Sequence, residues 1–379
     1  MRQVEIMRTG ENSESRVVVA IPVRDEQEYI GLCLGALRQQ TRRAEVILLL
    51  LNNCTDDTRA RCHAWETALP ELRVTECMLG PVQASAGAAR RLALNLACSL
   101  DEADIVMTTD ADAVPAPDWI ARNLAAIAAG AEVVCGMARL VPADAAALPE
   151  RLHEAHRQEA LCLEALDALI AQIDPDPYDP WPRHQEHSGA SIAVSRAALL
   201  RAGGAPNVPS GEDRELIARL RLVDARIRHA PDISVEVSGR ILGRASGGMA
   251  EAIRRRLQHG PELLADAALE PAIDAYRRAH ARARLRQVRC CGRGAQALGA
   301  DLLVGAPAIH QALQKRFLGA AWAEIETISP VLQRRRVPTA ELEREARQAR
   351  WLRAQLAAQP ECPDCGKADP CEGGVTVGI

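Results

Sequence analysis

Short apolar runs alternate with helix-like segments along the first third of the chain. Continuous apolar runs at 16–21, 45–51 and 103–108 predict buried strands, because a strand covered on both faces carries apolar side chains on both sides. The segment "LRVTECM" (72–78) also reads as a strand, which makes 103–108 the fourth. Apolar positions recur at helical spacing in 26–40 and 87–100, which predicts helices between these strands. The alternation predicts an α/β fold with a mostly parallel, Rossmann-like sheet and helices on both faces.

Farther along the chain the pattern predicts longer elements. We expect a strand at 132–140, a long helix at 144–172, a short strand at 190–195 and a helix that opens at 210–220. Residues 226–248 suggest two short strands, followed by a loop that is rich in glycine and arginine. Beyond this loop the pattern becomes helical and rich in arginine.

These shifts divide the chain into four predicted parts. Residues 16–248 form the α/β domain, and residues 249–360 form a helical, arginine-rich C-terminal extension. Residues 1–15 form an N-terminal extension. The cysteine-containing tail at 361–379 is expected to lack regular structure.

Composition excludes several classes of partner. The 379-residue chain has 46 Lys and Arg against 50 Asp and Glu, so it lacks the polycation character that duplex nucleic acid requires. Aromatic residues make up only 2%, which leaves few side chains to stack on single strands, and we expect no nucleic-acid partner. The N-terminal residues lack an apolar signal, and the longest aliphatic run, at 46–51, is too short to span a bilayer. We therefore expect a cytoplasmic protein without a transmembrane segment.

Polar clusters follow three of the predicted strands. The cluster "PVRDE" (22–26) follows the first strand, "NNCTDD" (52–57) the second and "TDAD" (109–112) the fourth. In open α/β sheets, ligands bind at the carboxyl ends of the strands. The three clusters therefore predict a binding site at one edge of the sheet.

Asp110 and Asp112 are the candidate metal ligands of this site. An extended chain places residues two apart on the same side, and two close carboxylates repel unless a cation lies between them. The alternative is a turn after the strand, because Asp favours turns. The chain lacks the glycine patterns of a P-loop or of a dinucleotide-binding loop after the first strand. Mg²⁺ or Mn²⁺ held by these aspartates is a different way to bind a substrate diphosphate.

Five motifs, in this order, carry a resemblance to a known family. They are "VAIPVRDEQEYIGLCLGAL", "LLNNCTDDT", "GAARRLALNLA", "DIVMTTDADAVP" and "GEDREL". Their order and spacing resemble those of the family 2 glycosyltransferases of GT-A fold, over roughly residues 16–245. The resemblance implies a metal-dependent enzyme that moves a sugar from a nucleoside diphosphate sugar to an acceptor hydroxyl, with inversion.

The resemblance also assigns roles to single residues. Asp213 falls on the catalytic base, and Asp110 and Asp112 fall on the metal ligands, with Asp110 also serving the ribose. The residues expected to contact the nucleotide are Pro22, Arg24, Glu26, Asn52, Arg90 and Asp110. Ser210 and Asp213 also have the spacing of a helix capping box, so a structural role for Asp213 stays open.

The sequence departs from the family pattern at two places. Asn52 stands where relatives carry an acid that contacts the base, and the segment 237–248 has no histidine where many relatives have a further metal ligand. Arginines in that segment suit a diphosphate or an anionic acceptor, because the guanidinium fork matches phosphate and carboxylate. The residues expected to contact the acceptor or phosphate are Trp181, His187, Glu212, Arg240 and Arg244.

Two alternative functions remain open at this point. The chain could be a catalytically inactive relative that binds a nucleotide sugar, or a sugar-phosphate nucleotidyltransferase, although the latter class usually carries a glycine-rich loop after the first strand. The expected partners are a nucleotide sugar and an acceptor that the sequence does not identify. The basic segment 276–289 also allows peripheral contact with a membrane, but a solvated helix face is the simpler interpretation.

Overall fold

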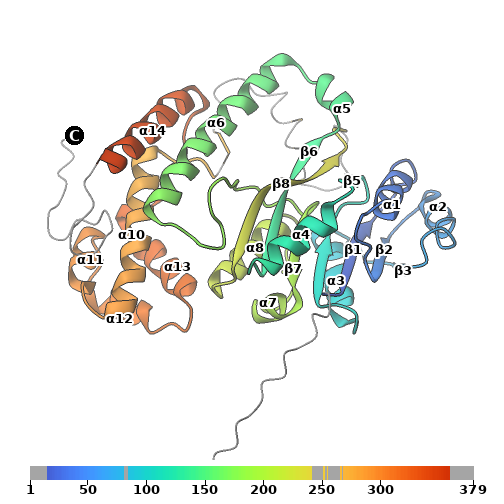
Figure 1. The fold of residues 1–379 in the computed structure, drawn as a ribbon, viewed down its shortest axis with the longest axis horizontal. Coiled ribbons are helices and arrows are strands. Elements are labelled where there is room, and N and C mark those ends of the chain that lie inside the picture. The colour runs from blue at the N-terminus through green and yellow to red at the C-terminus, as the bar shows by residue number, and fades with distance from the viewer. Residues whose placement is uncertain are drawn as a thin grey trace, which may run out of the picture. The chain divides into compact units, whose positions relative to one another are not determined.

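The computed structural model describes residues 15–80, 84–240, 251, 254, 265–266 and 268–358 (Figure 1). The predicted N-terminal extension as far as residue 14, the predicted cysteine-containing tail and Arg244 lie outside the described residues. The described chain forms two compact units. The first comprises the residues up to Val141, Glu186–Leu220, and Ala225 to residue 240. The second comprises Pro142–Gln185, Arg221–Asp224, and the described residues from 251 onward.

A single twisted sheet forms the centre of the first unit. Within the described residues it has eight strands, in the order β3-β2-β1-β4-β7-β6-β8-β5. The strands are β1 Val17–Val23, β2 Val46–Asn52, β3 Leu72–Cys77, β4 Ile105–Thr108, β5 Ala113–Pro115, β6 Val133–Leu140, β7 Ile192–Ser195 and β8 Ile227–Val237. β7 runs antiparallel to β4 and β6, and β5 runs antiparallel to β8, whereas the other strands share one direction. The prediction of a mostly parallel sheet is confirmed.

Helices cover both faces of this sheet, as the apolar runs predict. Val17, Val19 and Ile21 of β1 belong to one buried cluster with α1, α2 and α4, whereas Val18 and Ala20 belong to a second with α3, α7 and α8. A strand buried on both faces has no polar side, which explains the continuous apolar run. The helices are α1 Ile30–Arg38, α2 Thr58–His63, α3 Ala86–Ser99, α4 Trp119–Ala128, α7 Arg196–Arg201 and α8 Glu212–Leu222.

Prolines account for several differences between the predicted and observed elements. The two short strands predicted in 226–248 are one strand, β8, and Pro231 lies where its register with β6 shifts. Bulged positions of this kind tolerate a residue without an N–H group. β5 and α4 have no counterpart among the predicted elements. β5 ends at Pro115 on the edge of the sheet, and α4 begins two residues after Pro117.

The second unit is built of helices. They are α5 Pro142–Ala146, α6 Glu150–Ile173, α10 Ala272–Cys291, α11 Ala295–Asp301, α12 Ala306–Leu313, α13 Leu318–Ile328, α14 Leu342–Ala358 and the 3₁₀ helices η1 Pro330–Leu332 and η2 Thr339–Glu341. The predicted helix 144–172 is split into α5 and α6, because Pro149 occupies the N-cap position of α6. Apolar side chains of α6, α10 and α14 share one buried cluster. Of the helices in the described segments, none has both the length and the apolar character needed to cross a bilayer.

Candidate active site

Two arginines, each bound by carboxylates from distant parts of the sequence, form the centre of the candidate site in the first unit. The Arg90 cluster consists of Arg90, Asp110, Glu212 and Asp213, and the Arg240 cluster consists of Glu26, Asp112 and Arg240. Their residues come from α3, the segments after β1, β4 and β8, and the first turn of α8 (Figure 1). The structure thus brings together most of the charged residues that the sequence singled out.

Arg90 is a buried hub on α3. Its side chain donates to four oxygens: Glu212 Oε1 from Nε at 2.9 Å, Thr108 Oγ1 and the Gly189 carbonyl from Nη1 at 2.7 and 3.1 Å, and the Asp110 carboxylate from Nη2. Only 8% of Arg90 is exposed. Burial alone would lower the pKa of Arg90, but the carboxylates of Asp110 and Glu212 raise it above its ordinary value. Arg90 is therefore a fixed positive charge beside Asp110.

Gly189 connects Arg90 to Asp213. Its N–H donates to Asp213 Oδ2 at 3.2 Å, while its carbonyl oxygen accepts from Arg90. Asp213 Oδ1 also accepts from the N–H of Arg214 at 2.8 Å, within the first turn of α8. Asp213 therefore has contacts both at a helix start and inside the site. Burial raises the pKa of Asp213, and the neighbouring charge of Glu212 raises it further.

Asp110 and Asp112 lie in a turn and not in an extended segment, which corrects the geometry expected from the sequence. The N–H of Ala113 donates to the Asp110 carbonyl at 3.1 Å and closes this turn between β4 and β5. The turn directs the two carboxylates to different arginines, Asp110 to Arg90 and Asp112 to Arg240. Both interpretations of the pair, a turn and a charged site, apply together.

The Arg240 cluster joins the segments that follow β1, β4 and β8. Arg240 donates from Nη1 to Glu26 Oε2 at 2.8 Å and from Nη2 to Glu26 Oε1 at 2.6 Å, which is a bidentate pair. Arg240 Nη2 also lies 3.1 Å from Asp112 Oδ2. The guanidinium carbon lies 5.3 Å from the centre of the Tyr29 ring, within the range of a cation–π contact.

The donor set of the two clusters suits a hard divalent cation. Burial raises the pKa of Asp112 to about 6, and the charge of Asp110 adds to this effect. The carboxylates outnumber the two arginines, so the site is short of positive charge. In the part of the chain that the structure describes, no three His, Cys, Asp or Glu side chains are grouped to hold a metal by themselves. Mg²⁺ commonly takes only one or two protein carboxylates, with substrate oxygens as its other ligands, so Asp110 and Asp112 fit such an ion.

The other residues predicted to contact a nucleotide lie on the same edge of the sheet. Pro22 is half-buried within β1, and Arg24 is exposed just after it. Asn52 ends β2 and is buried, and its side-chain amide donates to the Val23 carbonyl at 2.9 Å. Thr55 N–H donates to Asp25 Oδ1 at 2.7 Å and fixes the segment after β2 to the segment after β1.

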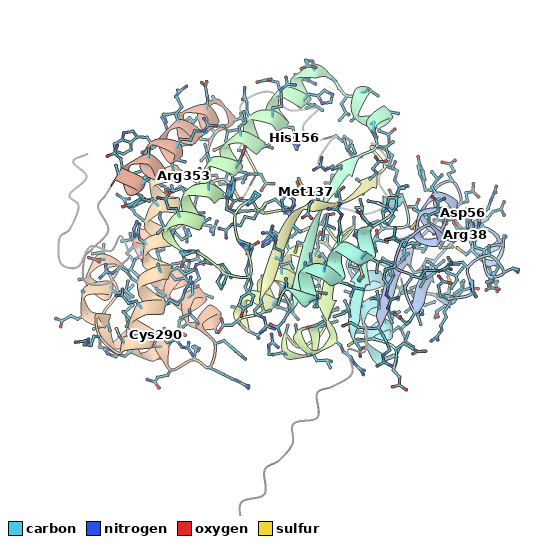
Figure 2. The ribbon with its side chains drawn as sticks, viewed as in Figure 1. Arg38, Asp56, Met137, His156, Cys290 and Arg353 are labelled. Carbon is cyan, nitrogen blue, oxygen red and sulfur yellow. The ribbon has the colours of Figure 1, made fainter. Side chains whose placement is uncertain are left out.

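Figure 2 shows the side chains as sticks and labels Asp56, in the segment that follows β2. Asp56, labelled there, accepts a hydrogen bond through Oδ2 from the N–H of Gln27 at 3.3 Å. Asp57 N–H donates in return to Gln27 Oε1 at 3.0 Å. The two strand-end clusters are therefore held to each other, as their common position at the sheet edge predicts.

Other predicted residues have different surroundings. His187 Nε2 lies 3.1 Å from Nε2 of His229, a buried residue of β8 that sequence reasoning missed. Trp181 belongs to the second unit and is 37% exposed. Gly189 and Thr108 were also missed. A glycine two residues after a candidate histidine, and a threonine two residues before Asp110, have no pattern that separates them from ordinary loop and strand residues.

Comparison with known proteins adds one match to a family model. The model described as "Glycosyl transferase family 2" matches residues 18–161, a segment that contains the first two strand-end clusters, Arg90 and both aspartates. No curated protein sequence matches the chain.

Three solved structures illustrate the similarity in three dimensions. S. aureus TarS 1-349 in complex with UDP has 15% sequence identity and a TM-score of 0.44, over 82% of this chain and 90% of that chain. The mannosyltransferase PcManGT from Pyrobaculum calidifontis, in complex with GDP-Man and Mn²⁺, has 18% identity and a TM-score of 0.43, over 89% and 84% of the two chains. Glucosyl-3-phosphoglycerate synthase from Mycobacterium tuberculosis, in complex with Mn²⁺, UDP and phosphoglyceric acid, has 20% identity and a TM-score of 0.38, over 64% and 77%.

Proposed function

Because residues 18–161 belong to glycosyl transferase family 2 and the chain is thus a glycosyltransferase, we propose that it transfers a sugar from a nucleoside diphosphate sugar to an acceptor hydroxyl. The reaction inverts the anomeric carbon in a direct displacement. Asp213 takes the proton of the acceptor hydroxyl, which is a poor nucleophile until that proton is removed.

The position of Asp213 is the observation that carries this proposal. Its carboxylate is held by two backbone N–H groups, from Gly189 and Arg214, which fix its direction, and among the described residues it forms no salt bridge. Burial raises its pKa, which brings the carboxylate closer to the basicity that suits proton transfer near neutral pH. A carboxylate locked in a salt bridge would be a weaker base.

The Arg90 cluster and the strand-end loops form the donor side of the site. Arg90 holds Asp110 in place, so that this carboxylate can accept hydrogen bonds from the ribose. Pro22, Arg24, Glu26 and Asn52 line the same sheet edge and contact the nucleotide. Since one N–H of the Asn52 side-chain amide is engaged with the backbone of β1, its second N–H and its oxygen are the groups that would contact the base.

Asp112, together with Asp110, would hold Mg²⁺ or Mn²⁺ in this proposal. The bound ion supplies Lewis-acid stabilisation of the departing diphosphate. The chain's own residues orient the carboxylates: Arg90 fixes Asp110, and the turn closed by Ala113 fixes the spacing of the two aspartates. Arg90 and Glu212 stay paired and keep the positive charge next to the donor side.

Acceptor contacts complete the proposal. His187 and Glu212 of the first unit are assigned to the acceptor, and Arg240 and Arg244 to the diphosphate or to an anionic acceptor; Trp181, which the sequence also assigned to the acceptor, belongs to the second unit. Residues 16–248 serve as the catalytic domain and 249–360 as a helical extension, in a cytoplasmic protein. These assignments rest on the sequence patterns.

The test is nucleotide release from UDP- and GDP-sugars with Mn²⁺, measured with and without a panel of acceptors. Asp213→Asn is expected to lower turnover at least about 100-fold, the usual contribution of a general base, while calorimetry shows unchanged binding of the nucleotide. Asp101→Asn, at an exposed aspartate just after α3, is the matched control and should keep full turnover.

Two outcomes would contradict the proposal in different ways. If Asp213→Asn turned over at the wild-type rate, the base assignment would be wrong. If the wild type bound nucleotides tightly but released none from any donor, the alternative of an inactive nucleotide-sugar-binding relative would replace the proposal.

A further inference from the structure

We propose that Arg240 competes with a divalent cation for the Asp112 carboxylate and thereby sets how tightly this site holds a metal. The inference rests on the proposed function, because it concerns the metal site of that reaction. It gives Arg240 control of the metal affinity, in addition to its proposed contact with the diphosphate.

The first argument is the geometry of the guanidinium. Arg240 Nη2 lies 3.1 Å from Asp112 Oδ2, so the arginine already neutralises the carboxylate that the cation needs. Arg240 lies three residues after the end of β8, and its N–H donates to Ser238 Oγ at 3.3 Å. The arginine side chain is only 22% exposed, so water weakens this contact less than at the surface.

The second argument is that Arg240 has another anchor. Both of its terminal nitrogens bind Glu26, at 2.8 and 2.6 Å, and its guanidinium lies over the Tyr29 ring. Release from Asp112 therefore leaves the arginine in a bidentate ion pair and not buried without a counter-ion. The exchange of one cation for another at Asp112 needs no large rearrangement of the chain.

The third argument is electrostatic linkage. A divalent cation at Asp112 and the guanidinium of Arg240 carry like charges that would share one carboxylate, and each must weaken the binding of the other. A substrate diphosphate supplies new negative charge for Arg240. Cation binding is then weak in the absence of donor and becomes tighter when donor is present. The arginine in this way couples metal loading to donor binding.

The experiment measures binding of MnCl₂ alone to the full chain, by electron paramagnetic resonance of free Mn²⁺. Arg240→Gln is expected to bind Mn²⁺ at least tenfold more tightly than the wild type. Adding Asp112→Asn to this variant is expected to abolish the increase in Mn²⁺ affinity. Since Arg240→Gln removes the bidentate ion pair of the buried Glu26, the double variant Glu26→Gln/Arg240→Gln is measured as well and is expected to retain the tighter binding.

Arg122→Gln is the matched control, because Arg122 also bridges two aspartates, Asp118 and Asp232, and its loss changes the net charge equally. It should leave the affinity for Mn²⁺ unchanged. Equal or weaker Mn²⁺ binding in both Arg240 variants would overturn the inference, as would a complete lack of Mn²⁺ binding in every form. Sugar transfer by the wild type is measured separately. If sugar is transferred but the Arg240 variants do not bind Mn²⁺ more tightly, only the inference is wrong. If the Arg240 variants bind Mn²⁺ more tightly but no sugar is transferred, only the proposed function is wrong.

Discussion

Arg90 and Arg240 each hold two carboxylates, but their surroundings give them different tasks. Arg90 is 8% exposed and has four hydrogen-bond partners, so removal of its charge would take this counter-ion from the half-buried carboxylates of Asp110 and Glu212. Arg240 is more exposed and keeps Glu26 as a partner when Asp112 is taken away. The side chain of Arg90 is therefore held in one position, whereas that of Arg240 can release Asp112 and stay paired with Glu26.

Gly189 is the glycine whose close approach to Arg90 matters for the candidate site. A Cβ atom added there would lie 2.7 Å from Cζ and 2.9 Å from Nε of Arg90, and the guanidinium cannot move without loss of its hydrogen bonds. We expect Gly189→Ala to lower the free energy of unfolding by about 2 kcal/mol and to reduce turnover at least about tenfold. Urea unfolding and the nucleotide-release assay check these values.

Gly31→Ala provides the control for this substitution. At Gly31, near the start of α1, the nearest atom to an added Cβ is Trp65 Nε1 at 4.0 Å, so alanine fits. Helix propensity then favours the variant, and its stability should equal or slightly exceed that of the wild type. If Gly189→Ala behaved like Gly31→Ala, the link between Arg90 and Asp213 would have no role.

The sequence identified most of the charged residues of the site but not how they pair. Glu26 and Arg240 are 214 positions apart, and Arg90 and Glu212 are 122 apart. No local pattern reports contacts at such separations, because the fold alone brings the side chains together. The same reason hides Gly189, whose importance comes from the neighbouring guanidinium and not from its own backbone.

At the scale of elements, the arginines of α10 are less available to an external partner than the basic segment 276–289 suggests. Its arginines suggested a face that could meet an anionic membrane, but Arg282 and Arg286 both bind the buried carboxylate of Asp174. Arg278 is itself buried and is paired with Glu270. These arginines therefore form ion pairs inside the second unit, which neither the membrane-contact nor the solvated-face interpretation of this segment included.

Asp167 makes the stability of α6 depend on pH. Burial raises its pKa to about 6, while a hydrogen bond from Gln185 and the charge of Arg183 oppose this effect. In the unfolded chain its pKa is about 3.9, so between about pH 4 and 6 the folded state holds more protons. The stability that this group contributes is thus fully present below about pH 4 and is lost as the pH rises to about 6.

We therefore expect Asp167→Asn to be more stable than the wild type above pH 6, by about 2–3 kcal/mol, and equally stable near pH 4. Thermal and urea unfolding at pH 4.5, 6 and 7.5 measure the difference. For Asp101→Asn, at an exposed aspartate, the difference in stability from the wild type should not change with pH. A variant of Asp167 that is less stable at pH 7.5 would mean that the negative charge is needed by Arg183.

At the scale of the whole molecule, chain order and spatial units differ. α6 precedes β7 in sequence, yet its Cys162, Leu166 and Leu169 belong to a buried cluster with α10 and α14. Separation of the chain at residue 248 would remove α10 and α14 and expose these side chains to water. A long apolar stripe left without its cover promotes association.

We expect a chain that ends at residue 248 to aggregate or to expose apolar surface, although it keeps every strand of the sheet. A chain that ends after Ala358 retains α14 and serves as the control. Size-exclusion chromatography and binding of a hydrophobic dye distinguish the two. A monomeric, cooperatively unfolding product that ends at residue 248 would show that α6 does not need the C-terminal helices.

The sequence by itself determined the alternation of strands and helices, the mostly parallel sheet and the edge at which Asp110 and Asp112 lie. These features depend on local periodicity and on the rule that polar loops follow apolar strands, and both can be read from neighbouring residues. Only the tertiary structure decided which arginine meets which carboxylate, that the aspartates lie in a turn, and that α6 packs with the C-terminal helices. Those facts depend on contacts between segments far apart in the chain, and the energy of such contacts leaves no periodic trace in the sequence.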